Sequence, residues 1–141
     1  MENVNKYHNG KIYKLISPNT DKIYIGSSCE KYLSNRLAGH KKDWKRYINE
    51  KIIKKKYSSH DLFDFGNVKI QLIEIYKCEN VFELHNRERY YIEQNKDICL
   101  NKSIPNRTSK EYYNDNKELI KQKRKEHYKS LKESIESKLI K

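Results

Sequence analysis

Five side chains that can exchange a proton, bind an anion or bind a cation occur along the first ninety residues: Tyr13, Tyr24, Arg36, His40 and Glu88. Phenol and imidazole groups can take up and release protons, and a guanidinium matches two oxygens of an anion. A carboxylate is a preferred ligand of hard cations. Each residue type is common by itself. Their order, with Arg36 and His40 one helical turn apart and Asn101 following Glu88, indicates an active site.

The two tyrosines are predicted to share one face of a β-hairpin. Residues 11–16 (KIYKLI) and 22–26 (KIYIG) form the strands, because apolar residues are regularly spaced in both and turn-forming residues lie between them. A four-residue loop at 18–21 predicts three pairs: Ser17 with Lys22, Leu15 with Tyr24, and Tyr13 with Gly26. A register slip of one residue would separate the tyrosines. Gly26 lacks a side chain, so it leaves room for the backbone of a ligand.

The next element should be a helix over about residues 35–48, with Ser34 as its N-cap. Arg36 and His40 are four residues apart, so they project together beside the face that packs on the sheet. The spacing predicts a buried stripe on that helix, formed by Leu37, Trp44 and Ile48.

Two more elements complete the predicted sheet layer. Residues 58–65 are expected to form a short helix that Gly66 closes. Residues 67–76 (NVKIQLIEIY) are β-branched and apolar, which is typical of a strand. The fold class is therefore α/β, with a small three-stranded, mostly antiparallel sheet flanked by helices.

Glu88 occupies an inward position on a helix predicted over residues 81–95. It lies four residues after Leu84 and four before Ile92, on the same helical stripe. A buried carboxylate needs a cation or several hydrogen-bond donors. A structural ion pair with Arg or Lys and a bound metal ion both remain open.

The predicted domain covers residues 8–105, and a basic helical arm follows over 108–141. Thr108 and Glu111 form a capping-box pattern that starts the arm. Its apolar stripe is thin, so we expect a solvated helix: Tyr113, Ile120, Tyr128, Leu131 and Ile135. Binding of DNA and a passive role both fit such a helix.

The charge of the chain points to a polyanionic partner. Its formal net charge is +12, and residues 109–141 carry only part of it, with 10 Lys and Arg against 6 Asp and Glu. A lysine-rich solvated surface is the alternative explanation. No stretch approaches the roughly 20 apolar residues of a membrane span, so no membrane partner is expected.

The cysteines and the amino-acid composition indicate the compartment and the kind of genome from which the protein comes. Cys29, Cys78 and Cys99 lack metal-ligand spacing, which indicates reduced thiols in an intracellular protein. Lys, Asn, Ile and Tyr are frequent while Ala38 is the single alanine, so the codons are AT-rich. This composition is consistent with a viral or phage gene.

Residues 10–103 resemble the GIY-YIG nuclease family. KIY and YIG carry Tyr13 and Tyr24 in the family's order and at its usual separation. The other motifs are NRLAGH with Arg36 and His40, NRERYYIEQ with Glu88, and CLNKS with Asn101. The chain departs from the family pattern at Lys11, where the first motif usually has a glycine.

This resemblance implies a metal-dependent DNA endonuclease. Tyr13 would be the general base, supported by Tyr24 and His40. Arg36 would bind the phosphate, and Glu88 would hold one Mg²⁺ or Mn²⁺. Asn101 and Gly26 would be structural residues, and the basic side chains expected at the nucleic acid are Lys11, Lys41, Lys45 and Arg46.

Three biological roles fit this reading. A homing-type or viral nuclease suits the short chain, and a structure-specific DNA repair nuclease is the enzymatic alternative. A catalytically idle DNA-binding module is the alternative from another class.

Overall fold

The computed structural model describes residues 3–49 and 56–140. Its elements, in chain order, are η1 (Lys6–Asn9), β1 (Lys11–Ser17), β2 (Thr20–Ser28), α1 (Leu33–Asn49), α2 (His60–Phe65), β3 (Lys69–Ile75), α3 (Val81–Gln94) and α4 (Ser109–Leu139). The chain divides into two compact units, the first ending at Asn106 and the second beginning at Arg107. Each unit is described by itself.

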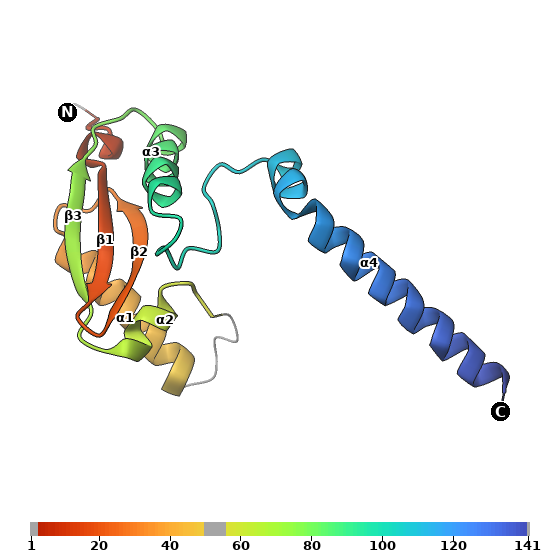
Figure 1. Ribbon diagram of the computed structural model, residues 1–141. Coiled ribbons are helices and arrows are strands. Elements are labelled where there is room, and N and C mark those ends of the chain that lie inside the picture. Colours follow the sequence, from red (N-terminus) through yellow and green to blue (C-terminus); the bar gives the residue numbers. More distant parts are fainter. Residues whose placement is uncertain (1–2, 50–55, 141) are drawn as a thin grey trace. The chain divides into compact units, whose positions relative to one another are not determined.

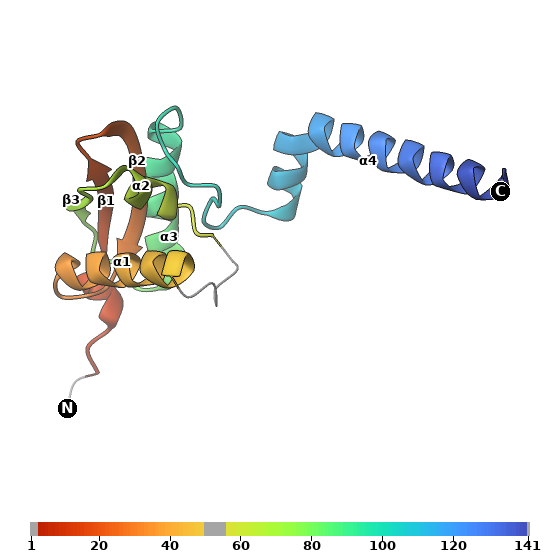
Figure 2. The same cartoon turned by 90° about the horizontal axis from the view of Figure 1, so that it is seen from below.

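The first unit is built on a three-stranded antiparallel sheet in the order β2-β1-β3. Helix α3 covers one face of this sheet, and helices α1 and α2 cover the other, as Figures 1 and 2 show together. The expected small antiparallel sheet with flanking helices is therefore confirmed.

The hairpin has the predicted register around both tyrosines but a shorter turn. Tyr13 pairs with Gly26 and Leu15 pairs with Tyr24. The prediction of a four-residue loop was wrong, because Ser17 pairs with Thr20 instead of Lys22 and an irregularity after Leu15 absorbs the difference. The Ser17 hydroxyl holds this tight turn, since it accepts a hydrogen bond from the Asn19 backbone at 3.2 Å and donates one to the Gly66 carbonyl at 2.6 Å.

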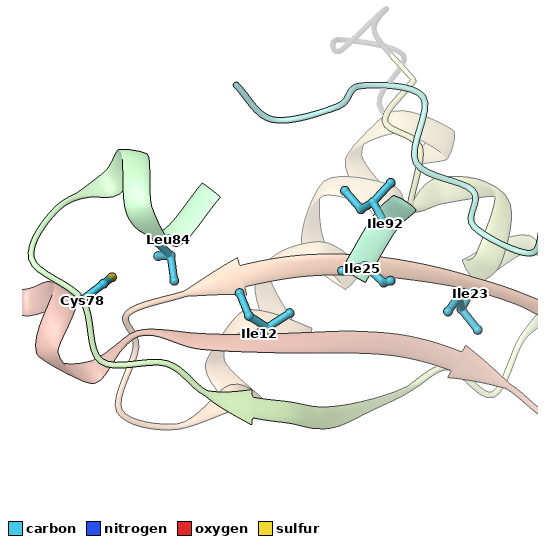
Figure 3. Close-up of a cluster of buried hydrophobic side chains, with 6 residues drawn as sticks. All are labelled: Ile12, Ile23, Ile25, Cys78, Leu84 and Ile92. Carbon is cyan, nitrogen blue, oxygen red and sulfur yellow. The ribbon is translucent and has the colours of Figure 1, made fainter. Parts of the chain in front are cut away.

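Alternation along the strands produces two separate cores. Six residues form the core between the sheet and α3: Ile12, Ile23, Ile25, Cys78, Leu84 and Ile92 (Figure 3). Four residues form the core on the other face, where α1 and α2 pack: Tyr13, Leu15, Leu62 and Phe63. The tyrosine face and the isoleucine face of the hairpin are thus opposite, as the register requires.

Helix α1 matches the prediction in part: Leu37 and Trp44 pack against the core as expected, but the N-cap and Ile48 differ. It begins at Leu33, so Ser34 lies inside the helix and is not its N-cap. Ile48 was predicted to be buried but is 44% exposed, and His40 is the one buried residue of the helix. His40 meets the tyrosine face of the sheet, while Ile48, near the end of the helix, lies outside the core.

Both ends of the first unit add to the sheet layer. The Tyr7 ring of η1 packs against the α3-side core, so the unit begins before residue 8. At the other end, Ile23 of β2 forms a parallel bridge with Cys99, and its backbone bonds Ile98 and Leu100. This segment therefore covers part of the free edge of β2. The three cysteines carry free thiols.

The second unit is dominated by α4, a helix of 31 residues. Thr108 is its N-cap, and both hydrogen bonds of the predicted capping box with Glu111 are present. None of its residues is buried. Among the helices in the described ranges, none is long and apolar enough to cross a membrane.

Candidate active site

The Tyr13 hydroxyl is at the centre of a buried hydrogen-bond network. Its oxygen lies 2.7 Å from His40 Nε2, and Arg36 Nε donates to it at 3.1 Å. Tyr13 is 0% exposed and His40 is 7% exposed. The predicted pairing of Arg36 and His40 on α1 is therefore realised, and both side chains meet the first tyrosine of the hairpin.

The protonation of this network follows from burial and from the fixed donor of Arg36. Burial, with a further contribution from the Arg36 charge, lowers the pKa of His40 to about 4, so the imidazole is neutral near pH 7. Burial raises the pKa of Tyr13, although Arg36 opposes that shift, so the phenol keeps its proton. Because Arg36 can only donate, we assign the Tyr13 proton to the bond with His40 Nε2.

Gly26 makes room for the Tyr13 ring. A Cβ atom at position 26 would lie 2.4 Å from the Tyr13 hydroxyl oxygen and 2.6 Å from its Cζ. The expected space opposite Tyr13 is thus filled by Tyr13 itself and not left open to a ligand. Gly26 is required because the ring lies directly across its Cα.

Tyr24 connects the network to a cleft. Its ring contacts the His40 ring edge-on, with 5.4 Å between the centroids. Tyr24 also lines a cleft of about 330 Å³ together with the following polar residues: Ser58, His85, Glu88, Asn101 and Ser103. Burial raises the pKa of Tyr24, and the neighbouring Tyr13 and Glu88 add to this shift.

Glu88 brings a buried carboxylate to the same cleft. It is 9% exposed, and its Oε2 accepts a hydrogen bond from the Ser27 hydroxyl at 2.9 Å. Burial raises the pKa of Glu88 to about 7, while Ser27 and the Arg36 charge act in the opposite direction. No Lys or Arg forms an ion pair with Glu88 within the described ranges. The structural ion-pair alternative therefore lacks its partner there.

The surroundings of Glu88 fit a hard divalent cation. The carboxyl group is buried with one hydrogen-bond donor, and in the described part of the chain no Lys or Arg is paired with it, so its charged form is costly unless a cation binds or a proton neutralises it. Residues 3–49 and 56–140 contain no group of three or more His, Cys, Asp or Glu side chains suited to a metal ion. Glu88 would therefore provide one ligand, and water and substrate oxygens would provide the others, as Mg²⁺ favours.

Asn101 closes the free edge of β2 just beside this site. Its side-chain oxygen accepts from the Ile25 backbone N–H at 2.9 Å, and its amide donates to the Ile25 carbonyl at 2.7 Å. The side chain thus imitates a strand residue at the point where the pairing of residues 98–100 with β2 ends. This geometry is that of a structural residue, the role that the sequence favours.

The basic residues expected at a nucleic acid lie in two settings. The Lys11 ammonium donates to the carbonyls of Asn9 and Glu30 at 2.9 and 2.7 Å, so backbone groups already hold it. The other three line a shallow groove along α1: Lys41, Lys45 and Arg46.

Two residues of the site were missed in the sequence. Ser27 directly follows Gly26, and strand alternation turns its side chain to the α3 face, where it meets Glu88. His85 lines the cleft and precedes Glu88 by three residues, a spacing that makes the two side chains neighbours on a helix. Both signals were present in the sequence.

The site as a whole surrounds β2, the edge strand of the sheet. Tyr13, Arg36 and His40 lie on its α1 side, and Ser27 and Glu88 lie on its α3 side. Comparisons of the chain with protein-family models, curated proteins and solved structures each gave no match.

Proposed function

We propose that the protein is a metal-dependent DNA endonuclease of the GIY-YIG type, which hydrolyses phosphodiester bonds. One observation carries the proposal. A hydrogen-bonded Arg36–Tyr13–His40 network adjoins a cleft in which the buried carboxylate of Glu88 forms no ion pair with Lys or Arg within the described ranges. The net charge of +12 agrees with a polyanionic substrate.

Arg36 is the proposed phosphate-binding group. Its Nε is bonded to Tyr13, and its terminal nitrogens have no hydrogen-bond partner in the part of the chain that the structure describes. Two parallel N–H donors match two phosphate oxygens, which a lysine cannot reproduce.

Tyr13 is the proposed base, because its hydroxyl contacts both a proton acceptor and a cation. Transfer of its proton to His40 Nε2 would leave a phenolate beside Arg36. The phenolate would then take a proton from the attacking water. Tyr13 is completely buried, so the proposal requires Arg36 to turn toward the phosphate and uncover the hydroxyl.

Glu88 is the residue proposed to hold Mg²⁺ or Mn²⁺. A cation bound there would offset negative charge on the phosphate and on the leaving oxygen. Ser27 keeps the carboxylate oriented toward the cleft through its hydrogen bond to Oε2. Tyr24 shares the cleft and contacts the His40 ring, so it is placed between the two halves of the site.

A nicking assay tests the proposal. Supercoiled plasmid should become nicked or linear in the presence of wild-type protein and Mg²⁺, and should remain intact with EDTA or with Glu88→Gln. Binding of DNA without cleavage in Mg²⁺ or Mn²⁺ would contradict the proposal.

The full burial of the Tyr13 hydroxyl favours a second candidate, an idle DNA-binding module. A hydroxyl that never meets solvent cannot accept a proton from water. In that case, plasmid would be shifted in a gel and left uncut at every concentration of divalent cation.

A further inference from the structure

We propose that His85 is a further catalytic residue, which gives a proton to the leaving 3′ oxygen. This inference rests on the proposed function and adds a group that neither the resemblance nor the Tyr13 network includes. The reaction needs such a group, because an alkoxide is a poor leaving group unless a proton or a cation neutralises it.

His85 is at the correct place for this role. It lines the cleft of about 330 Å³ together with Tyr24 and Glu88. It lies three residues before Glu88 on α3, so the two side chains are neighbours on one helix face. A phosphate that reaches Glu88 therefore also comes within reach of the imidazole.

The ring of His85 makes no hydrogen bond among the described residues, unlike the three other imidazoles of the first unit, which is called the compact unit below. His8 is paired with Glu79, His40 with Tyr13, and a His60 nitrogen accepts from the Tyr57 backbone. Neither ring nitrogen of His85 has a hydrogen-bond partner within the ranges 3–49 and 56–140, and the side chain is partly exposed. Both nitrogens are therefore free to meet a substrate.

Three other polar groups of the cleft are less suited to give up a proton. Asn101 uses its amide on the Ile25 backbone, and the Ser58 hydroxyl accepts from the Lys102 N–H. Glu88 cannot be the acid while it binds a cation, because the binding form is the carboxylate. An imidazole is the side chain that exchanges protons most readily near neutral pH.

The proposed reaction is the hydrolysis of one phosphodiester bond. The oxygen of the attacking water forms a bond to phosphorus while the bond from phosphorus to the 3′ oxygen breaks. One proton of the water passes to the tyrosine base, and one proton passes from the His85 imidazolium to the 3′ oxygen. The products are a 5′-phosphate and a 3′-hydroxyl, and Tyr13 is again a phenol. His40 then loses to solvent the proton that it took from Tyr13, and His85 regains a proton from solvent.

The test compares two substrates of the full-length protein. A duplex oligonucleotide, whose cut position is first mapped with wild type, is made with a normal 3′-oxygen linkage or with sulfur in place of that oxygen. A thiolate leaves without protonation. His85→Gln should therefore lower cleavage of the oxygen substrate by about 100-fold or more and leave cleavage of the sulfur substrate close to wild type. The variant-to-wild-type ratio is used for each substrate, so a different affinity of the cation for sulfur cancels.

Controls separate this role from a structural one. Glu88→Gln should lose activity on both substrates, and His8→Gln, which alters a histidine outside the cleft, should lose it on neither. Equal losses of His85→Gln on both substrates, or no loss on either, would overturn the inference while the nuclease proposal stands. A wild-type protein that cuts neither substrate would overturn both.

Discussion

The compact unit and α4 differ in the contacts that hold their side chains. In the first unit, residues 3–106 without 50–55, Tyr13 is held by α1 and Glu88 by β2, segments distant from them in sequence. In α4 no residue is buried, and its start is fixed by a capping box between Thr108 and Glu111. Tertiary contacts therefore assemble the proposed chemistry, whereas the start of α4 is set by local interactions.

The basic residues of α4 are concentrated in one part of the helix. Residues 121–132 contain one acidic residue, Glu126, against six basic ones: Lys121, Lys123, Arg124, Lys125, Lys129 and Lys132. Lys121, Lys125 and Lys129 recur every four residues and so follow one side of the helix. Such a row would suit phosphate groups, and binding would stabilise a helix none of whose residues is buried.

The largest expected effect is that of Glu88→Gln, which should abolish cleavage and leave DNA binding intact. The amide keeps the shape of the side chain and can still accept from Ser27, but it removes the charge that would hold a cation. We expect plasmid cleavage in Mg²⁺ to fall below detection, while DNA affinity in a gel-shift assay is unchanged. Glu93→Gln, on the exposed side of the same helix, is the matched control. Wild-type cleavage by Glu88→Gln would make this carboxylate a structural group.

Tyr13→Phe should separate chemistry from packing. The ring stays in place over Gly26 while the hydroxyl is lost, so cleavage should fall by about 100-fold or more. The free energy of unfolding should fall by only about 0.5–1.5 kcal/mol, the value of a lost hydrogen bond. Tyr128→Phe, on exposed α4, should change neither quantity. Normal cleavage by Tyr13→Phe would leave the network a structural feature.

His40 should make the compact unit sensitive to acid. Its pKa in the folded protein is about 4, below the 6.5 of an ordinary histidine, because the neutral form is favoured there. The associated stability is therefore fully present above pH 6.5 and is lost as the pH falls toward 4. It corresponds to roughly 3 kcal/mol.

The measurement is the melting temperature at pH 7 and at pH 4.5. The loss between these values should be smaller in His40→Gln than in wild type. His60, whose pKa burial also lowers, contributes in both proteins. His127→Gln, on α4, should behave as wild type. An equal acid sensitivity of His40→Gln would show that His40 is not held in its neutral form.

Gly26→Ala should disturb the packing of Tyr13. The new Cβ would meet the hydroxyl oxygen at 2.4 Å, and the completely buried ring has no free space to enter. We expect a loss of about 1–3 kcal/mol in the free energy of unfolding. Gly39→Ala is the control, since a Cβ there meets nothing within 4 Å and a helical alanine should stabilise by about 1 kcal/mol. Similar effects of both substitutions would contradict the close approach.

Deletion of residues 109–141 should have the mildest effect. The melting temperature of the compact unit should stay close to wild type, because α4 contributes no buried residue. DNA affinity should fall, and the slope of log affinity against log salt should decrease by about 0.9 for each lost phosphate contact. An unchanged slope would mean that α4 does not bind DNA, and unfolding would mean that it completes the core.

The parts of the structure that local patterns control were predictable from the sequence. Strand alternation placed Tyr13 opposite Gly26, and the capping box marked the start of α4. The 3.6-residue period of α3 placed Glu88 between buried Leu84 and Ile92. In each case the pattern is a property of neighbouring residues, so no long-range contact was needed to read it.

Errors arose where a distant contact decided the result. Ile48 was expected to be buried, but α1 packs with His40 inward, because His40 meets Tyr13 there. The turn of the hairpin tightened because Ser17 bonds the Gly66 carbonyl, 49 residues away. His85 was missed because Tyr24 and Ser58, which complete the cleft beside it, come from segments distant from α3 in the sequence.

The helices, the strands, the hairpin register around Tyr13 and Tyr24 and the positive charge of the chain could be read from the sequence. Each of these follows from residue type and short-range spacing. Only the tertiary structure decided that Arg36, Tyr13 and His40 share one network, that the Tyr13 hydroxyl is covered, and that Glu88 and His85 meet one cleft at the edge of β2. The physical reason is that burial and hydrogen-bond partners depend on segments tens of residues apart, and burial is what shifts the protonation of these side chains.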